Sequence, residues 1–239
     1  MIFSLTSLSA HNLEQSVNSE DRSPDNVARD IYRHPYETLS FFGIKPDMTV
    51  VELNPGGGWY TEILANYIHY PGTLITAQGS YYFEGFKKKM NSNPMYGRVE
   101  IVNLNSNLAE PNSVDAVITF RNLHNWLGAG MDSIFRSSFK ALKPGGSFGV
   151  VEHRAKPGTD FETMKTSGYV TEDHAIEVAL KHGFELVEKS DINANPKDTK
   201  DHAKGVWTLP PTYRLKNKDR DKYSAIGESD RMTLLFKKP

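Results

Sequence analysis

The segment Val50–Glu62 constrains the fold of this chain more than any other part of its sequence. It reads Val-Val-Glu-Leu-Asn-Pro-Gly-Gly-Gly-Trp-Tyr-Thr-Glu. Its β-branched start, which ends in Glu52, predicts a strand. The positions that follow have the apolar spacing of a helix: Ile63, Leu64, Tyr67 and Ile68. Between strand and helix, three glycines predict a tight turn that a ligand can approach closely, because glycine has no Cβ and tolerates positive φ.

Two classes of ligand use such a turn. Dinucleotide sites read Gly-x-Gly-x-x-Gly and place a pyrophosphate at the helix N-terminus. Here Thr61 stands where the third glycine would be, and the Glu52 carboxylate before the turn would repel a pyrophosphate. A carboxylate attracts an amino group or a sulfonium, and S-adenosylmethionine carries both without a phosphate. The pattern therefore favours that cofactor over NAD, with an ordinary strand-turn-helix as the alternative.

Other parts of the sequence agree with this interpretation. They are Arg33–Leu39, Arg121–Trp126, Lys143–Gly146, Glu152–Ala155 and Ser229–Arg231. With the glycine segment, these stretches make the chain resemble class I S-adenosylmethionine-dependent methyltransferases over roughly residues 27 to 239. More narrowly, the sequence resembles a bacterial group of predicted methyltransferases of unassigned substrate.

The order of the predicted elements indicates an α/β fold. We expect a flexible N-terminal segment at 1–25 and a single methyltransferase-like domain at 26–239, since 239 residues suit one α/β domain. Strands are predicted near 48–53, 73–77, 99–103, 114–120, 146–152, 184–191 and 232–236. Helices are predicted near 59–69, 81–91, 130–142 and 171–182, and one or two within 26–43, interrupted at Pro35. This alternation indicates a mostly parallel sheet with helices on both faces.

The resemblance adds the order of the strands. It implies a Rossmann-like seven-stranded sheet of order 3-2-1-4-5-7-6, with the last strand antiparallel and an N-terminal helical cap. Ligands in such sheets bind beyond the carboxyl ends of strands 1 and 4. The polar stretch near 193–229 is an insertion, and unusually long loops of this kind are often functional. It is either a lid or partner-binding hairpin, or a surface insertion packed on the sheet edge.

Composition excludes several classes of function. The formal net charge of −1 gives no case for nucleic acid, and the absence of cysteine excludes disulfides and thiolate metal sites. No stretch is long and apolar enough to span a bilayer. Residues 1–10 are at most a weak remnant of a signal peptide, so both a cytoplasmic and a periplasmic location stay open.

The resemblance implies a set of residues around the cofactor. In this set Gln78 stands where an acid usually accepts from the ribose hydroxyls, and Asn105 stands where an acid commonly contacts adenine. Both keep hydrogen-bonding ability and lack charge. Thr61 is expected at the methionine carboxylate or as a helix cap. The complete predicted set is Glu52, Asn54, Gly56, Gly57, Gly58, Thr61, Gln78, Asn105, Phe120 and Arg121.

Methyl transfer from a sulfonium needs alignment of donor and acceptor, and a base only if the acceptor carries a proton. His153 is the first choice for such a base and His124 the second, because both follow strands that end at the edge of the glycine turn. The predicted substrate-binding residues are His34, Tyr36, Tyr60, Trp126 and Arg154. No metal site is expected, since no His-x-x-x-His spacing is present.

We therefore expect S-adenosylmethionine-dependent methyl transfer to a small-molecule acceptor. The sequence leaves open whether the protein forms a homodimer. One alternative is a non-catalytic binding module of the methyltransferase fold, which the uncharged Gln78 and Asn105 motivate. The other is an NAD-dependent oxidoreductase, against which Glu52 and the missing third glycine argue.

Overall fold

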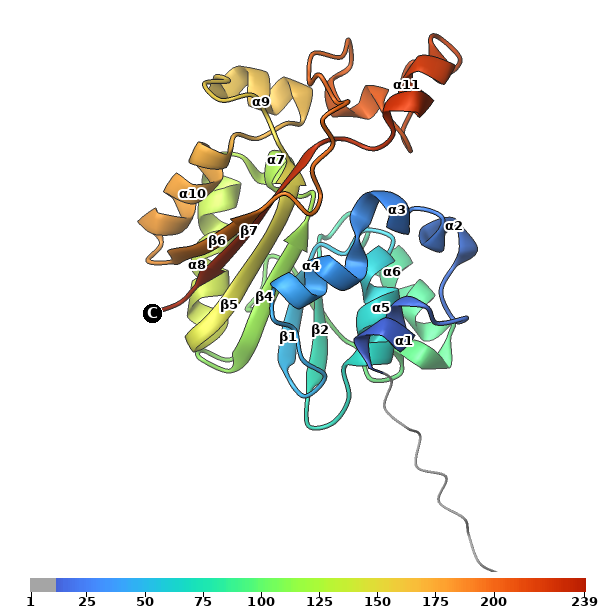
Figure 1. Cartoon of the computed structure of the whole chain (residues 1–239). Coiled ribbons are helices and arrows are strands. Elements are labelled where there is room, and N and C mark those ends of the chain that lie inside the picture. Colours follow the sequence, from blue (N-terminus) through green and yellow to red (C-terminus); the bar gives the residue numbers. More distant parts are fainter. Residues whose placement is uncertain (1–11) are drawn as a thin grey trace, which may run out of the picture.

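A twisted seven-stranded sheet forms the centre of the molecule (Figure 1). The computed structural model describes residues 12–239. The strands are β1 Thr49–Leu53, β2 Thr73–Gln78, β3 Glu100–Asn103, β4 Val114–Phe120, β5 Leu142–His153, β6 Glu185–Ser190 and β7 Arg231–Lys237. Their order is β3-β2-β1-β4-β5-β7-β6, and β7 runs antiparallel to both β5 and β6. The predicted fold class and strand order are confirmed.

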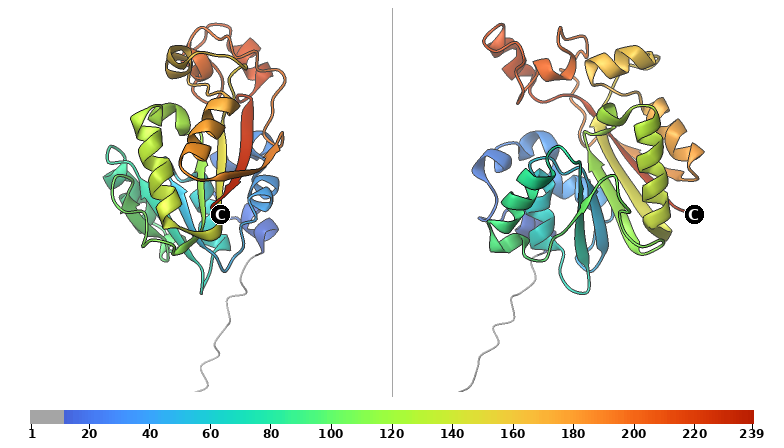
Figure 2. Two further views of the ribbon diagram at one scale, coloured as in Figure 1. Left: turned by 90° about the vertical axis from the view of Figure 1, so that its left-hand side faces the viewer. Right: turned by 180° about the vertical axis from the view of Figure 1, so that it is seen from behind.

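Helices cover both faces of this sheet (Figure 2). The larger elements are α5 Trp59–Tyr67, α6 Phe83–Asn91, α8 Ala129–Ala141 and α10 Glu172–Lys181. The shorter ones are α1 Leu13–Val17, α2 Pro24–Val27, α3 Asp30–Arg33, α4 Pro35–Phe41, η1 Pro94–Tyr96, α7 Leu123–Trp126, α9 Phe161–Ser167, η2 Gly205–Thr208 and α11 Arg220–Ile226. One apolar core joins α8 and α10 to the sheet, and a second joins α1, α4 and α5 to its other face. Within residues 12–239, no helix is long and apolar enough to cross a bilayer.

The N-terminal part is more ordered than its polar sequence suggests. Asn12 caps α1 in a reciprocal capping box with Gln15, and Leu13 and Val17 are buried in the core beside α5. The segment at 1–25 that was predicted to be flexible therefore contains the helix α1. The signal-peptide remnant expected at 1–10 lies outside the described residues.

The predicted break at Pro35 is confirmed. His34 takes the left-handed conformation with φ of 41° between α3 and α4, and Pro35 opens α4. Behind this break, Phe42 packs directly on Gly149 of β5. A Cβ at Gly149 would lie 2.6 Å from the Phe42 ring, so glycine is required for α4 to sit this close to the sheet.

The 193–229 insertion stands beyond the carboxyl ends of the strands, beside α9 (Figure 1). It contains η2 and α11 and has no strand, so the predicted lid or partner-binding element is not a hairpin. The buried Asp198 anchors it by accepting bonds from the Tyr169 hydroxyl at 2.9 Å and from the backbone N–H of Asp230 at 2.8 Å. His202 also bonds this carboxylate, at 2.8 Å.

Candidate active site

The glycine turn leaves backbone open at the end of β1. Gly56 and Gly58 have φ of 60° and 81°, and Gly58 caps the N-terminus of α5. No atom lies within 4 Å of the position that a Cβ would take on Gly56 or Gly57. The turn therefore has the free approach that the sequence predicted.

Glu52 lies beneath this turn, and only 2% of its surface is exposed. Its Oε2 accepts a hydrogen bond of 2.6 Å from the Thr61 hydroxyl. Burial raises the pKa of Glu52 to about 7, and the Thr61 bond opposes this rise. In the described part of the chain no ion pair joins Glu52 to Arg121. Thr61 thus holds this carboxylate, rather than being free for a ligand.

Two aromatic rings cover the same region. Tyr60 and Phe120 stack with centroids 3.5 Å apart and planes 9° apart. Together with Glu52, Asn54 and Arg121 they line a hollow of only about 10 Å³, which is room for about one water. A ligand that contacts Glu52 through this hollow therefore requires the side chains around it to move.

An amide pair joins the ends of β1 and β4, where the winding of the sheet reverses. Asn54, in the left-handed conformation with φ of 47°, donates from Nδ2 to Oδ1 of Asn122 at 2.8 Å. Asn122 in turn donates to the backbone oxygen of Leu53 at 3.2 Å. Sequence reasoning placed Asn54 here but missed Asn122, although it lies in the stretch Arg121–Trp126 that carried the resemblance.

Gln78 ends β2 and is completely buried, yet neither its amide oxygen nor its amide nitrogen has a hydrogen-bond partner. Burying an unpaired amide is costly, and a hydroxyl pair such as that of a ribose would satisfy it. Asn105 is exposed, and its backbone N–H donates to Oδ1 of Asn103 at 2.9 Å. Asn103 in turn donates to the Ser80 hydroxyl at 3.1 Å.

A larger pocket of about 580 Å³ opens on the outer side of the turn. It is lined by Gly56, Gly57, Tyr81, Tyr82, Gly85, Phe86 and Lys89. Tyr81 and Tyr82 are 89% and 60% exposed. The bare turn, the unpaired Gln78 amide and these aromatic walls suit an adenosine-containing cofactor with a cationic amino-acid end.

His124 and His153 meet beyond the ends of β4 and β5, with ring centroids 5.2 Å apart. Nδ1 of His124 lies 3.0 Å from Oε1 of the buried Glu152, so a His124 that donates this bond keeps Nε2 as an acceptor. The ring of Trp207, from the 193–229 insertion, meets His124 edge-on at 6.0 Å.

His153 is less suited to accept a proton. Its Nδ1 bonds the Ser229 hydroxyl at 2.6 Å. Burial, with the charges of His124 and nearby arginines, holds the pKa of His153 well below its usual range. The geometry thus favours His124 over His153 as a base, which reverses the order of the sequence prediction.

The same three residues bring potential metal ligands together, although their sequence spacing gave no sign of it. Ligand atoms of His124, Glu152 and His153 all lie within 4.8 Å of one another. However, the Glu152 carboxylate already accepts from His124 Nδ1 and from the backbone N–H of Leu123 and His153. These bonds indicate that Glu152 orients His124 and the backbone around it.

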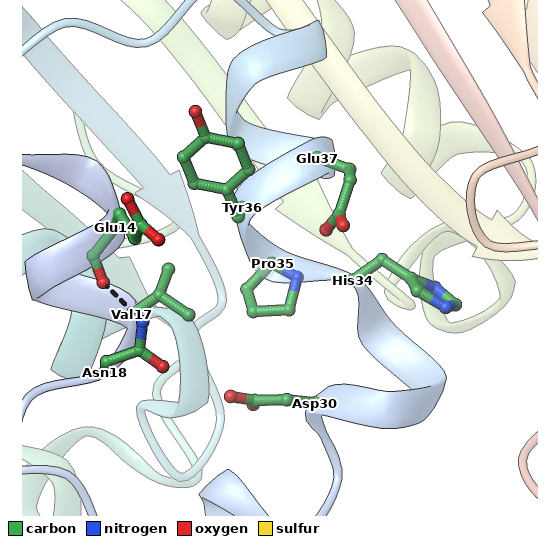
Figure 3. Close-up of a pocket in the computed structure, with 8 residues that line it drawn as sticks. All are labelled: Glu14, Val17, Asn18, Asp30, His34, Pro35, Tyr36 and Glu37. Atoms are coloured by element: carbon green, nitrogen blue, oxygen red, sulfur yellow. Dashed lines mark hydrogen bonds between the residues drawn. The ribbon is translucent and has the colours of Figure 1, made fainter.

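The predicted substrate-binding residues do not gather into one wall. His34 and Tyr36 line a pocket of about 480 Å³ between α1 and the α3–α4 break (Figure 3). Tyr60 is in the ring stack, and Trp126 packs against the core on the α8 side. The structure therefore places Tyr36, Tyr60 and Trp126 in separate surroundings.

Arg154 is fully engaged by the protein. It donates to both oxygens of Asp230, at 3.0 and 2.9 Å, and to Glu172 and Asp191 at 3.1 and 2.7 Å. These bonds raise the pKa of Arg154 and tie β5, β7 and α10 together. The geometry gives Arg154 a structural role instead of the predicted contact with substrate.

The fold is similar to those of several solved proteins. A S-adenosylmethionine-dependent methyltransferase from Aquifex aeolicus matches with a TM-score of 0.59 and 16% identity, over 77% of this chain and 94% of that chain. A geranyl diphosphate methyltransferase in complex with S-adenosylmethionine matches with a TM-score of 0.63 and 10% identity, over 95% of each chain. The [4+2]-cyclase SpnF matches with a TM-score of 0.62 and 17% identity, over 95% of this chain and 91% of that chain.

No protein-family model and no curated protein matches the sequence. At these identities, the structural likeness establishes the fold alone. The chain thus has the fold of class I methyltransferases.

Proposed function

We propose that this protein binds S-adenosylmethionine at the glycine turn and transfers its methyl group to a small-molecule acceptor. The observation that carries the proposal is the bare backbone of Gly56–Gly58 beside the Glu52 carboxylate, at the point where the sheet reverses its winding. The structural neighbours that are methyltransferases, one of them crystallised with S-adenosylmethionine, support it.

The residues would divide the binding between them. Glu52 would face the positive end of the cofactor, and ionising it there is favourable because a cation lowers the pKa of a neighbouring acid. Gln78 would pair its free amide with the ribose hydroxyls. When bound, the cofactor supplies an electrophilic methyl group whose transfer leaves a neutral thioether.

The acceptor would lie near His124. If the acceptor carries a proton, Nε2 of His124 is placed to take it, while Glu152 holds the ring through Nδ1. Trp207 and the anchored insertion would exclude water from this side. For an acceptor without a proton, these groups serve only to align it.

Isothermal titration calorimetry with S-adenosylmethionine and with S-adenosylhomocysteine tests the cofactor. We expect binding of both, and loss of binding in Gly57→Asp, whose side chain enters open space and so leaves the fold intact. NADH should give no signal. Absence of binding by the parent protein at millimolar cofactor would refute the proposal.

A binding module without methyl transfer is the second candidate. The uncharged Gln78 and the Tyr60–Phe120 stack over Glu52 favour it, and the neighbour described as a [4+2]-cyclase is a protein of this fold that is not named as a methyltransferase. Cofactor binding without methyl transfer to any of a broad panel of amines, phenols and carboxylic acids would support this candidate.

A further inference from the structure

Three arginines contact a single carboxylate, Glu228, between the α3–α4 cap and the start of β7, and a fourth, Arg121 at the end of β4, lies near enough for its charge to act on it. Glu228 Oε1 bonds Arg29 Nε at 2.5 Å, and Glu228 Oε2 bonds Arg33 Nε at 3.3 Å. Nη2 of Arg231 donates to the same Oε2. The fourth, Arg121, acts on both Arg33 and Glu228 through its charge. We name Arg29, Arg33, Arg121 and Arg231 the arginine cluster.

This cluster is deeply buried and under-compensated. Arg33 and Arg231 are 3% and 2% exposed, and Glu228 is 2% exposed. Burial acts to raise the pKa of Glu228, but the surrounding arginines together lower it to about 2, so it is ionised. Glu228 faces two buried guanidinium groups, those of Arg33 and Arg231, so the buried groups alone leave a formal excess of one positive charge, to which the partly exposed Arg29 adds. Buried charge without a partner is strongly unfavourable.

Several donors in the cluster have no partner. Nη1 of Arg33 and Nε of Arg231 are buried and make no hydrogen bond. The Arg121 guanidinium makes no hydrogen bond or ion pair within residues 12–239. Arg121 also has a φ of 61°, an unusual conformation for a residue other than glycine. Guanidinium groups with free donors are the usual partners of carboxylate and phosphate oxygens.

The cluster lies between the two parts of the proposed active site. Arg121 lines the hollow at Glu52 together with Tyr60, and the Tyr60 hydroxyl donates to the backbone oxygen of Arg33 at 3.2 Å. On the other side, Arg231 pairs in register with His153 across β5 and β7. Glu228 and Ser229, the partner of His153, line a pocket of about 270 Å³ beside His34.

We propose that Arg33, Arg121 and Arg231 bind an anionic group, a carboxylate or a phosphate, on the methyl acceptor. This inference rests on the proposed function, because it identifies the class of acceptor for that site. The anion would supply the missing counter-charge and pair with the free guanidinium donors. It would also fix the acceptor between Glu52 and the two histidines.

Inorganic phosphate is the first probe. In calorimetric titrations at constant ionic strength set with sodium chloride, we expect phosphate to bind the full chain with a millimolar dissociation constant and to raise its melting temperature. Arg121→Asn removes the charge but keeps a residue that tolerates positive φ, and it should weaken phosphate binding at least tenfold. Arg98→Asn, a matched change at an exposed turn, should leave it within twofold.

Arg29→Gln provides a second variant if Arg121→Asn fails to fold, because Arg29 is 26% exposed. It should weaken phosphate binding about threefold by lowering the charge of the cluster. Equal phosphate affinity in the parent protein and in whichever of these two cluster variants folds would overturn the proposal. So would the absence of phosphate binding to the parent protein.

Phosphate titration in the presence of saturating S-adenosylhomocysteine separates the acceptor from the cofactor. We expect phosphate to bind the complex at least as tightly as the free protein. Displacement of phosphate by S-adenosylhomocysteine would assign the arginines to the methionine carboxylate and overturn the acceptor assignment. Failure of S-adenosylhomocysteine to bind at all would overturn the proposed function. Phosphate binding to the free protein would still test the arginine cluster, because it does not depend on the cofactor.

Discussion

Nδ1 of His124 lies 3.0 Å from Oε1 of Glu152, although 28 residues separate them in the chain. The carboxylate is completely buried, and it also accepts from the backbone N–H of His153 at 2.7 Å. A side chain that bonds an imidazole and the backbone of both α7 and the end of β5 fixes the packing of these elements as well as the orientation of the ring.

Replacing this carboxylate should therefore affect stability first. Glu152→Gln leaves a similar shape but offers an amide N–H to groups that are themselves donors, so we expect a loss of roughly 2–4 kcal/mol in the free energy of unfolding. Urea denaturation monitored by circular dichroism measures it. His124→Gln, which removes only the ring, should cost clearly less, and equal losses in the two variants would contradict this account.

The raised pKa of Glu52 predicts a stability that depends on pH. A buried acid with a pKa of about 7 binds its proton more tightly than the unfolded chain, whose acid has a pKa of about 4.5. Glu52 therefore favours the folded state at low pH, and its own contribution should lower the free energy of unfolding by about 3 kcal/mol as pH rises from 4.5 to beyond 7. The depressed pKa of His153 contributes the opposite slope below the ordinary pKa of histidine, so the slope due to Glu52 is the difference between the parent protein and Glu52→Gln.

Glu52→Gln should remove this slope and make the protein more stable than the parent at pH 8. Glu188→Gln, at an exposed position of β6, is the matched control and should leave the slope unchanged. Chemical denaturation at half-unit steps of pH gives the comparison. A stability difference between the parent protein and Glu52→Gln that stays constant across the same pH range would disprove the role given to Glu52.

Cofactor affinity should have the opposite dependence on pH. A cationic guest favours the ionised form of Glu52, so we expect the S-adenosylmethionine affinity to increase between pH 5.5 and 8, with a midpoint close to 7. Calorimetry across this range measures it. In Glu52→Gln the affinity should be lower at pH 8 and nearly constant with pH, and a parent affinity that does not vary with pH would argue against contact between Glu52 and the cofactor.

Gly149 and Gly85 should respond in opposite ways to the same substitution. Gly149→Ala places a methyl group 2.6 Å from the Phe42 ring and should cost about 2 kcal/mol or more. Gly85→Ala, inside α6 with no atom within 4 Å of the new methyl, should stabilise by about 0.5–1 kcal/mol. Thermal denaturation of both variants measures these changes in stability. Destabilisation by Gly85→Ala would show that a side chain at this position of α6 is excluded by something other than the space around it.

Patterns local in the chain were enough to predict the strands, the main helices and the α/β class, whereas the strand order came from the resemblance to class I methyltransferases. The apolar runs of β1 and β4 and the glycine turn between β1 and α5 are each read from fewer than about fifteen adjacent residues. The helix α1 was not predicted, because it has only two apolar residues, Leu13 and Val17, and depends on packing against α5 for its stability.

The site was less predictable, since its side chains are matched across long distances in sequence. Arg154 was expected at the substrate from its position after β5, but Asp230, 76 residues later, binds it bidentately. Similarly, Arg33 and Glu228 are 195 residues apart. Such groups meet only through the packing of elements that are far apart in the chain.

Asp198 gives the 193–229 insertion a property that its sequence does not suggest. Its buried carboxylate bonds Tyr169, His202 and the backbone of Asp230 just before β7, and so attaches the insertion to the rest of the molecule. That carboxylate thereby couples the position of the insertion to the segments that lead into α10 and β7.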